Sequence, residues 1–111
     1  MAIIRYMRLF QRLKALREFE KAHLPFLKTI EDFDIVCEIG VRQESGNRIT
    51  MKELFLADIG AVSTVQRRLS RLRKLGAIEQ FSHNGDGRVI ELLLSAEVGA
   101  LYKRYAALLA E

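Results

Sequence analysis

The segment from Ala57 to Ser95 constrains the fold more than any other part of the chain, because it joins a helical repeat to a hairpin pattern. Apolar residues at steps of three and four positions lie on one side of a helix spanning about 62–75; they are Val62, Val65, Leu69 and Leu72. Gly76 is expected to end this helix, because glycine tolerates a positive φ just past a C-terminus. Two β-prone runs follow, 77–82 and 88–94, and the Asn-Gly and Asp-Gly pairs between them predict a hairpin.

A short helix and a turn are predicted before this segment. Thr50 is a suitable N-cap with Glu53 three residues later, so 51–57 is expected to be helical. Gly60 is expected to give the turn at 58–60 a conformation that other residues resist. Ile49 is expected to add a short strand beside the hairpin. Helix, turn, helix and hairpin in this order predict a winged helix-turn-helix, a mainly α fold with a small β-hairpin wing (α+β).

The flanking segments are predicted to be helical. A helix from Ile3 to about Lys21 carries a wide apolar stripe, so we expect contact with a second subunit; packing on the chain's own core is the alternative. Pro25 marks a break, and Ser95 is expected to cap the last helix. We expect one domain, residues 1–111, made of an N-terminal dimerisation helix and break (1–28), a winged-helix core (29–94) and a C-terminal dimerisation helix (95–111).

The helix after the break is predicted to begin with a capping box formed by Thr29 and Asp32. Its buried face is expected to comprise Ile30, Phe33, Val36 or Cys37, and Val41. Cys37 is the only cysteine, which excludes an intrachain disulfide and any multi-cysteine metal site. We expect it to be a small buried hydrophobic residue; a redox-sensing thiol is the alternative.

Composition fits one domain with a polyanionic partner. Half of the 111 residues are hydrophobic and the net charge is +4, which suits but does not require a nucleic acid. Basic residues crowd 62–75, whereas 31–44 is acidic. No apolar run approaches the ~20 residues of a membrane span, and arginines interrupt the apolar residues at the N-terminus, unlike a secretory signal. We therefore expect a cytoplasmic protein without membrane contact.

The helix predicted at 62–75 has the composition of a helix that reads DNA. Between Gly60 and Gly76 the chain carries five basic residues and no acidic one. A face of this kind has the width and the donors to enter the major groove; an ordinary solvated surface is the alternative. At about 100° per residue, the positions opposite the apolar row are Ser63, Arg67, Ser70 and Lys74, with Thr64, Gln66 and Arg71 on the flanks.

Contacts between such a helix and DNA divide into two kinds. Gln66 and Arg67 are candidates for base edges, because Gln suits adenine and a bidentate Arg reads guanine. In the wing, 82–88, Arg88 is the candidate for the minor groove; a pair with Asp86 that braces the hairpin is the alternative. The candidates for phosphate are Lys52, Ser63, Thr64, Arg71 and Lys74, and Ser70 is a candidate for either kind. Arg68 and Arg73 are expected to cover helix surfaces with their stems.

Enzymatic motifs are missing from the sequence. His23 and His83 are far apart and neither sits in a metal-ligand spacing, so no metal is expected. There is no P-loop and no dinucleotide-binding glycine motif, and no cofactor is expected. The sequence places no small-molecule effector. We expect a binding protein and not an enzyme.

Residues Ile49–Ser95 resemble the winged-helix region of the MarR family of bacterial transcriptional regulators. Ser63-Thr64-Val65 matches the opening of the family's recognition helix, and Leu72 followed by Gly76-Ala77-Ile78 matches its end. Asp86-x-Arg88 is followed at the family's spacing by Leu94-Ser95, where members usually have Leu-Thr. Ala61 stands where a capping Ser often sits.

This resemblance implies a homodimer, joined through its N- and C-terminal helices, that binds a pseudo-palindromic operator in double-stranded DNA. Each recognition helix would enter a major groove, and each wing would place its arginine at the minor groove. A transcriptional regulator is expected, with repression as its mode. Two other functions share these features: a winged-helix protein-interaction adapter, and a DNA-binding replication or partition factor.

Overall fold

The computed structural model describes the backbone of residues 2–83 and 86–110 and the side chains of residues 8–82 and 87–110. The chain divides into two compact units. One comprises residues 26–96, and the other comprises residues 1–25 with residues 97–111. The first unit contains the predicted winged helix, and the second contains the terminal helices.

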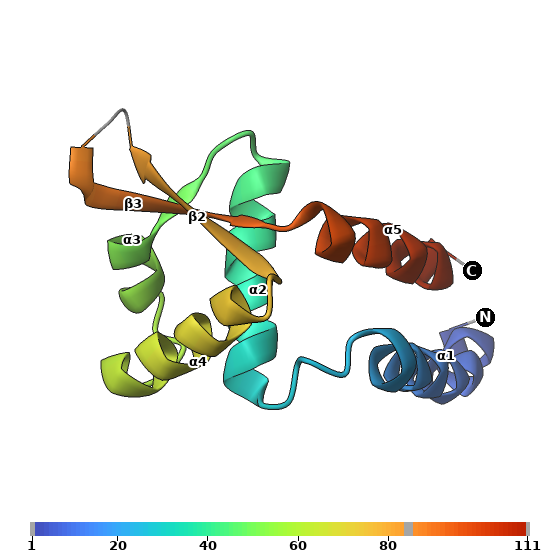
Figure 1. Cartoon of the computed structure of the whole chain (residues 1–111). Helices are drawn as coiled ribbons and strands as arrows, with labels where there is room; N and C mark the ends of the chain where they lie inside the picture. The colour runs from blue at the N-terminus through green and yellow to red at the C-terminus, as the bar shows by residue number, and fades with distance from the viewer. Residues whose placement is uncertain (1, 84–85, 111) are drawn as a thin grey trace. The chain divides into compact units, whose positions relative to one another are not determined.

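Residues 26–96 form helices and a small three-stranded antiparallel sheet (Figure 1). The strand order is β1-β3-β2, so β3 is central, and Ile49 pairs with Leu92 as the predicted short strand requires. The mainly α fold with a β-hairpin wing is therefore confirmed. In chain order the elements are α2 (Ile30–Glu44), β1 (Ile49–Thr50), α3 (Met51–Phe55), α4 (Val62–Lys74), β2 (Ile78–His83) and β3 (Asp86–Leu94).

The wing strands extend further than the sequence pattern predicted. β2 runs to His83 and β3 begins at Asp86, whereas the predicted connection was 83–87. The register shifts between Ser82 and His83, which marks a bulge near the end of the ribbon. The predicted Asn84-Gly85 turn lies outside the described residues, as do the side chains of His83 and Asp86.

Capping boxes begin two helices, as predicted. The hydroxyl of Thr29 accepts the N–H of Asp32 at 3.2 Å, and the carboxylate of Asp32 accepts the N–H of Thr29 at 3.1 Å. Thr50 and Glu53 do the same for α3. α3 ends at Phe55, two residues earlier than predicted, because Leu56 already serves as its C-cap.

Two glycines of this unit, Gly60 and Gly76, were predicted to adopt a backbone conformation that other residues resist. Gly76 has a φ of 79°, as expected for the residue that ends α4. In the turn between α3 and α4, however, Asp58 and not Gly60 has the positive φ, at 59°. Aspartate tolerates this region better than most residues because its short polar side chain bonds locally. The prediction for Gly60 was therefore wrong.

The core of residues 26–96 lies between α2, α4 and the sheet. Of the face predicted for α2, Val36 is buried as expected, but other members are not. Ile30 and Val41 are 71% and 61% exposed, Cys37 is exposed, and Val62 at the start of α4 is 49% exposed. The predicted burial of these residues was wrong. α2 is rotated so that a carboxylate joins its apolar row, and the buried residues of this helix are Asp32, Ile35, Val36 and Ile39.

The terminal unit pairs α1 (Ala2–His23) with α5 (Ala96–Ala110), close to the predicted spans. Tyr105 donates a hydrogen bond to Glu20 at 2.5 Å, and the rings of Phe19 and Tyr105 lie 5.4 Å apart. The guanidinium of Arg104 lies 5.5 Å from the centre of the Phe19 ring. Burial, followed by the bond to Glu20, raises the pKa of Tyr105.

Candidate nucleic-acid interface

α4 begins without a side-chain cap and ends in a tight glycine turn. Ala61 is the N-cap and makes no side-chain hydrogen bond, and no acidic residue occupies the first turn. At the other end, the N–H of Gly76 bonds to Arg73 and that of Ala77 to Leu72, each at 3.0 Å. This pattern is the Schellman motif. Because its first turn has neither a side-chain cap nor an acidic residue, α4 itself does not neutralise the positive end of its dipole.

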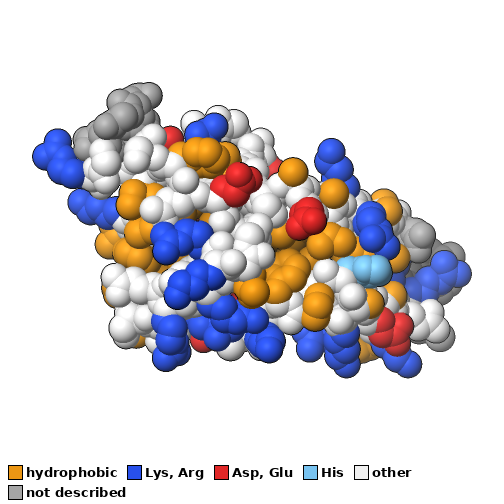
Figure 2. All heavy atoms as spheres, viewed as in Figure 1, with side chains coloured by type: hydrophobic (Ala, Val, Ile, Leu, Met, Phe, Trp, Pro, Cys, Tyr) orange, Lys and Arg blue, Asp and Glu red, His pale blue; other side chains and the backbone are white. Residues whose placement is uncertain are grey.

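The outer face of α4 is polar and basic. Val65, Leu69 and Leu72 are buried, while Gln66, Arg67 and Lys74 are exposed. Among the described residues, no side-chain hydrogen bond or ion pair engages these last three. Figure 2 shows Lys and Arg side chains gathered over α4. The cations that the sequence assigned to an outer face do lie there.

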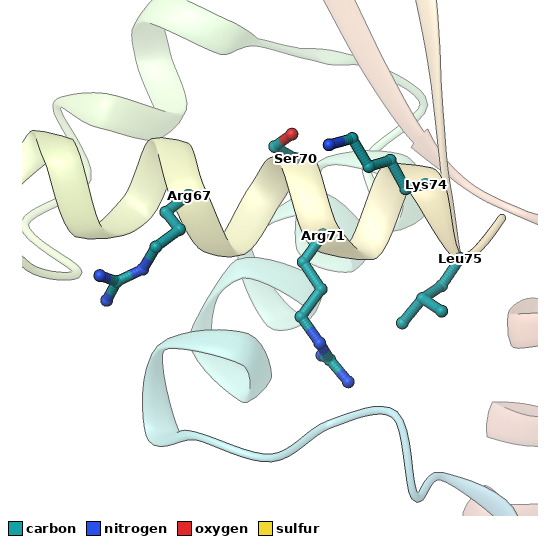
Figure 3. A pocket seen from close by; sticks show the side chains of 5 residues that line it. All are labelled: Arg67, Ser70, Arg71, Lys74 and Leu75. Carbon is teal, nitrogen blue, oxygen red and sulfur yellow. The ribbon is translucent and has the colours of Figure 1, made fainter.

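Two shallow hollows flank α4 and share Ser70. One, of about 180 Å³, lies against α3 and is lined by Met51, Phe55, Gln66, Leu69, Ser70 and Arg73. The other, of about 400 Å³, is lined by Arg67, Ser70, Arg71, Lys74 and Leu75 (Figure 3). The two candidates for base contacts, Gln66 and Arg67, therefore line different hollows.

A third hollow joins α3 to the wing. It measures about 330 Å³ and is lined by Thr50, Met51, Lys52, Phe55, Arg88, Val89 and Ile90. It brings together Lys52 and Arg88, which are far apart in sequence. The predicted pairing of Arg88 with Asp86 lies outside the described residues.

Ser63, Thr64 and Arg71 differ in their surroundings from the other candidate residues. Ser63 is exposed and Thr64 is half-buried in the first turn of α4, and neither lines these hollows. Arg71 turns toward the segment before α2 (Figure 3), where it donates to the carbonyl of Phe26 at 2.7 Å. It also lies 3.6 Å from the carboxylate of Asp32. Arg71 is thus engaged within the protein, and its contact with phosphate stays a prediction.

Arg68 forms the principal polar contact that the sequence reasoning missed. Its Nε and Nη2 atoms donate to the two oxygens of Asp32 at 2.7 and 2.5 Å, and the Asp32 side chain is 0% exposed. Burial alone would raise the pKa of Asp32, but the bonds from Arg68 and from the N–H groups of Lys28 and Thr29 lower it. The same pair raises the pKa of Arg68. The signal was present, because position 68 lies three residues after Val65 and four before Leu72, where a charge requires a partner.

α2 supports the other two elements of the candidate interface as well. Near its C-terminus, Arg42 donates to Glu53 of α3. Gln43 accepts the backbone N–H of Leu94 in β3 at 2.7 Å. Three polar contacts therefore fix α3, α4 and β3 to a single helix.

Within residues 2–83 and 86–110, no group of three or more His, Cys, Asp or Glu residues could hold a metal ion. None of the helices described is both long and apolar enough to cross a membrane.

Comparison with solved structures identifies the fold, although neither a protein-family model nor a curated protein matches the sequence. MarR from E. coli in its apo form is 21% identical, with a TM-score of 0.61 over 97% of this chain and 75% of that one. MepR from S. aureus in a DNA complex is 16% identical, with a TM-score of 0.70 over 99% and 84% of the two chains. The M. tuberculosis transcriptional regulator MosR, also in complex with DNA, is 24% identical, with a TM-score of 0.55 over 97% and 74%. The fold of this chain is the winged helix-turn-helix fold of the MarR-family regulators.

Proposed function

We propose that this chain is a sequence-specific double-stranded DNA-binding transcriptional regulator. α4 is the recognition helix for the major groove and the β2–β3 wing approaches the minor groove. The observation that carries the proposal is the outer face of α4, where Arg67 and Lys74 are exposed and have no ion pair within the described residues. Outward cations that have no counterion of their own suit a polyanion.

Two further observations support DNA as the partner. MepR and MosR, which share the fold, were solved in complex with DNA. In this chain, the hollow between α3 and the wing brings Lys52 and Arg88 together beside the recognition helix. Cations at the wing and on α3 would meet the backbone on either side of a groove.

The contacts divide according to position on α4. Gln66 and Arg67, about 100° apart around the helix, take the base edges. Ser63, Thr64, Ser70 and Lys74 hold the phosphates with Lys52 of α3, and Arg88 takes the minor groove. Arg71 adds a phosphate contact through guanidinium donors that Phe26 does not use.

The active species is proposed to be a cytoplasmic homodimer that acts as a repressor. α1 exposes Leu9, Phe10 and Leu13, and Phe10 is 76% exposed, so a second subunit would bury apolar surface there. A dimer would present two recognition helices to half-sites about 34–36 Å apart. A protein bound in this way excludes other proteins from the same DNA, which is the physical basis of repression.

A mobility-shift titration on random-sequence duplex DNA tests the proposal. We expect binding that weakens steeply as salt rises, because phosphate contacts release counterions. The double variant Arg67→Ala/Lys74→Ala should bind much more weakly, and Lys103→Ala on α5, also an exposed lysine, serves as the matched control. Absence of salt-sensitive binding by the wild type would instead favour the adapter. Selection from random duplexes would then give the operator.

A further inference from the structure

The buried row of α4 is narrow. Val65, Leu69 and Leu72 are 1%, 3% and 0% exposed, and they span only about 60° of the helix circumference. Apolar contact is non-directional, so such a row leaves rotation of the helix about its own axis weakly defined. Base reading requires side chains held within about 0.5 Å of the productive position. Something else must therefore fix the rotation.

One edge of the row is held by the Arg68–Asp32 pair. Both guanidinium bonds are short, at 2.7 and 2.5 Å, and the Arg68 side chain is only 16% exposed. Asp32 is itself held by the N–H groups of Lys28 and Thr29 at 2.8 and 3.1 Å. A planar fork on a fixed carboxylate restricts direction as well as distance. The Arg68–Asp32 pair therefore holds this edge of α4 rigidly against α2.

The other edge is held by Arg73, which donates a hydrogen bond to the side chain of Gln80 in β2. Arg68 and Arg73 lie about 140° apart around the helix, on opposite sides of the buried row. They bond to different elements, α2 and the wing. A rotation of α4 in either direction would stretch one of the two contacts.

We propose that Arg68 and Arg73 are positioning residues for DNA recognition, which set the rotation of α4 and thereby the aim of Gln66 and Arg67. This inference rests on the proposed function. It also removes two of the five basic residues of α4 from the set that neutralises phosphate. Arg68 and Arg73 donate hydrogen bonds to Asp32 and Gln80. Arg67 and Lys74 face outward.

The test measures two properties of the chain separately. One is discrimination, the ratio of affinities for a duplex selected by the wild type and for a shuffled duplex of the same composition. The other is the salt dependence of binding to the shuffled duplex. The variants are Arg68→Lys, Arg68→Met and Arg73→Met, with Lys74→Met as the matched control. All are compared at a temperature at which circular dichroism shows them folded.

We expect discrimination to fall about tenfold in each positioning variant, the cost of losing one well-aimed base contact. The salt slope should stay at the wild-type value, whereas Lys74→Met should lower it by about one. Arg68→Lys is the sharpest variant, because it keeps the charge and loses the fork. If the Arg68 variants do not fold, Arg73→Met at its exposed position gives the same two readings.

Two results would overturn the inference. One is wild-type discrimination in every variant that folds. The other is a drop in slope for Arg68→Met or Arg73→Met as large as that for Lys74→Met, which would make that arginine a phosphate contact. Failure of the wild type to bind either duplex would overturn the proposed function itself, and that measurement comes first.

Discussion

Arg42, in the last turn of α2, donates a hydrogen bond to the carboxylate of Glu53, which also accepts the N–H of Thr50 at 3.0 Å. One carboxylate thus closes the capping box of α3 and ties α3 to α2. The bond from Arg42, followed by that from the Thr50 N–H, lowers the pKa of Glu53 from 4.5 to about 2. The first helix of the helix-turn-helix is therefore held in place by an ionised group.

Replacing Glu53 by Gln should remove a pH-dependent part of the stability. Because the folded-state pKa is depressed, the contribution is present above 4.5 and is lost as pH falls toward 2. The Glu53 side chain is 41% exposed, so solvent screening limits the effect to about 1 kcal/mol or less. Urea unfolding of both proteins at several pH values measures the difference in their unfolding free energies. Curves for the variant and wild type that stay parallel down to acid pH would contradict the prediction.

Asp32→Asn should destabilise the protein by about 3–5 kcal/mol, because it leaves the guanidinium of Arg68 without its buried counterion. The double variant Asp32→Leu/Arg68→Met should recover most of the loss, since an apolar pair of similar volume needs no counterion. Thermal unfolding of Asp32→Leu, of Arg68→Met and of the double variant gives the coupling energy. Because the pKa of Asp32 is lowered, its contribution to wild-type stability is present above pH 3.8 and is lost as the pH falls further. Additive effects of the two substitutions would show that the pair is uncoupled.

Arg67→Ala and Lys74→Ala should weaken DNA binding in different ways. Loss of a base contact at Arg67 should cost about 1–3 kcal/mol on the selected duplex and little on random DNA. Loss of a phosphate contact at Lys74 should weaken binding to all sequences and lower the salt slope by about one. Salt titrations of both variants on both duplexes separate the two effects. An equal loss on every sequence would remove Arg67 from base reading.

Ala61→Ser should stabilise the protein by about 0.5–1 kcal/mol. Ala61 has φ −58° and ψ 140° and provides no side-chain cap for α4, so a serine hydroxyl at this position could accept a free N–H of the first turn. Thermal unfolding checks the gain, with Ala61→Val as a control that fills the position without an acceptor. A serine variant no more stable than the valine variant would mean that the cap does not form.

Cys37 should react completely with a thiol reagent in the native protein, because its side chain is exposed. Partial desolvation of the exposed thiol, followed by the charges of Asp34, Glu38 and Glu44, raises its pKa above 9.0. Its reaction at pH 7 should therefore be slower than that of the denatured chain and should accelerate as pH rises past 9.0. Mass spectrometry of timed reactions measures both rates. Protection of the native thiol at every pH would restore the original prediction of a buried residue.

The element order followed from local signals. Glycine at a helix end, paired capping residues and an Asn-Gly between β-prone runs act within a few residues. They located α3, α4 and the hairpin without knowledge of the tertiary structure. The end of α3 was two residues off, because Leu56 already closes that helix, and helix ends are the least well-determined feature of a sequence pattern.

The orientation of α2 could not be predicted in the same way. A count of apolar residues favoured the face with Ile30 and Val41, yet the buried row includes Asp32. The partner that makes this burial tolerable is Arg68, 36 residues away in the sequence. The helical pattern shows that a charge at position 68 needs a partner, but it does not show which distant residue supplies one, and the contacts of Arg42 and Gln43 were missed as well. On α4, by contrast, the periodic pattern placed both the buried residues Val65, Leu69 and Leu72 and the outward residues.

The three contacts made by α2 separate support from recognition in this protein. Gln66 and Arg67 lie on a structure that other side chains hold in place, namely those of Asp32, Arg42 and Gln43. The residues proposed to contact bases could therefore be exchanged for others without weakening the contacts that hold α4 in place. A lineage, or an engineer, could redirect such a chain to new target sequences by a few outward substitutions while its interior stays untouched.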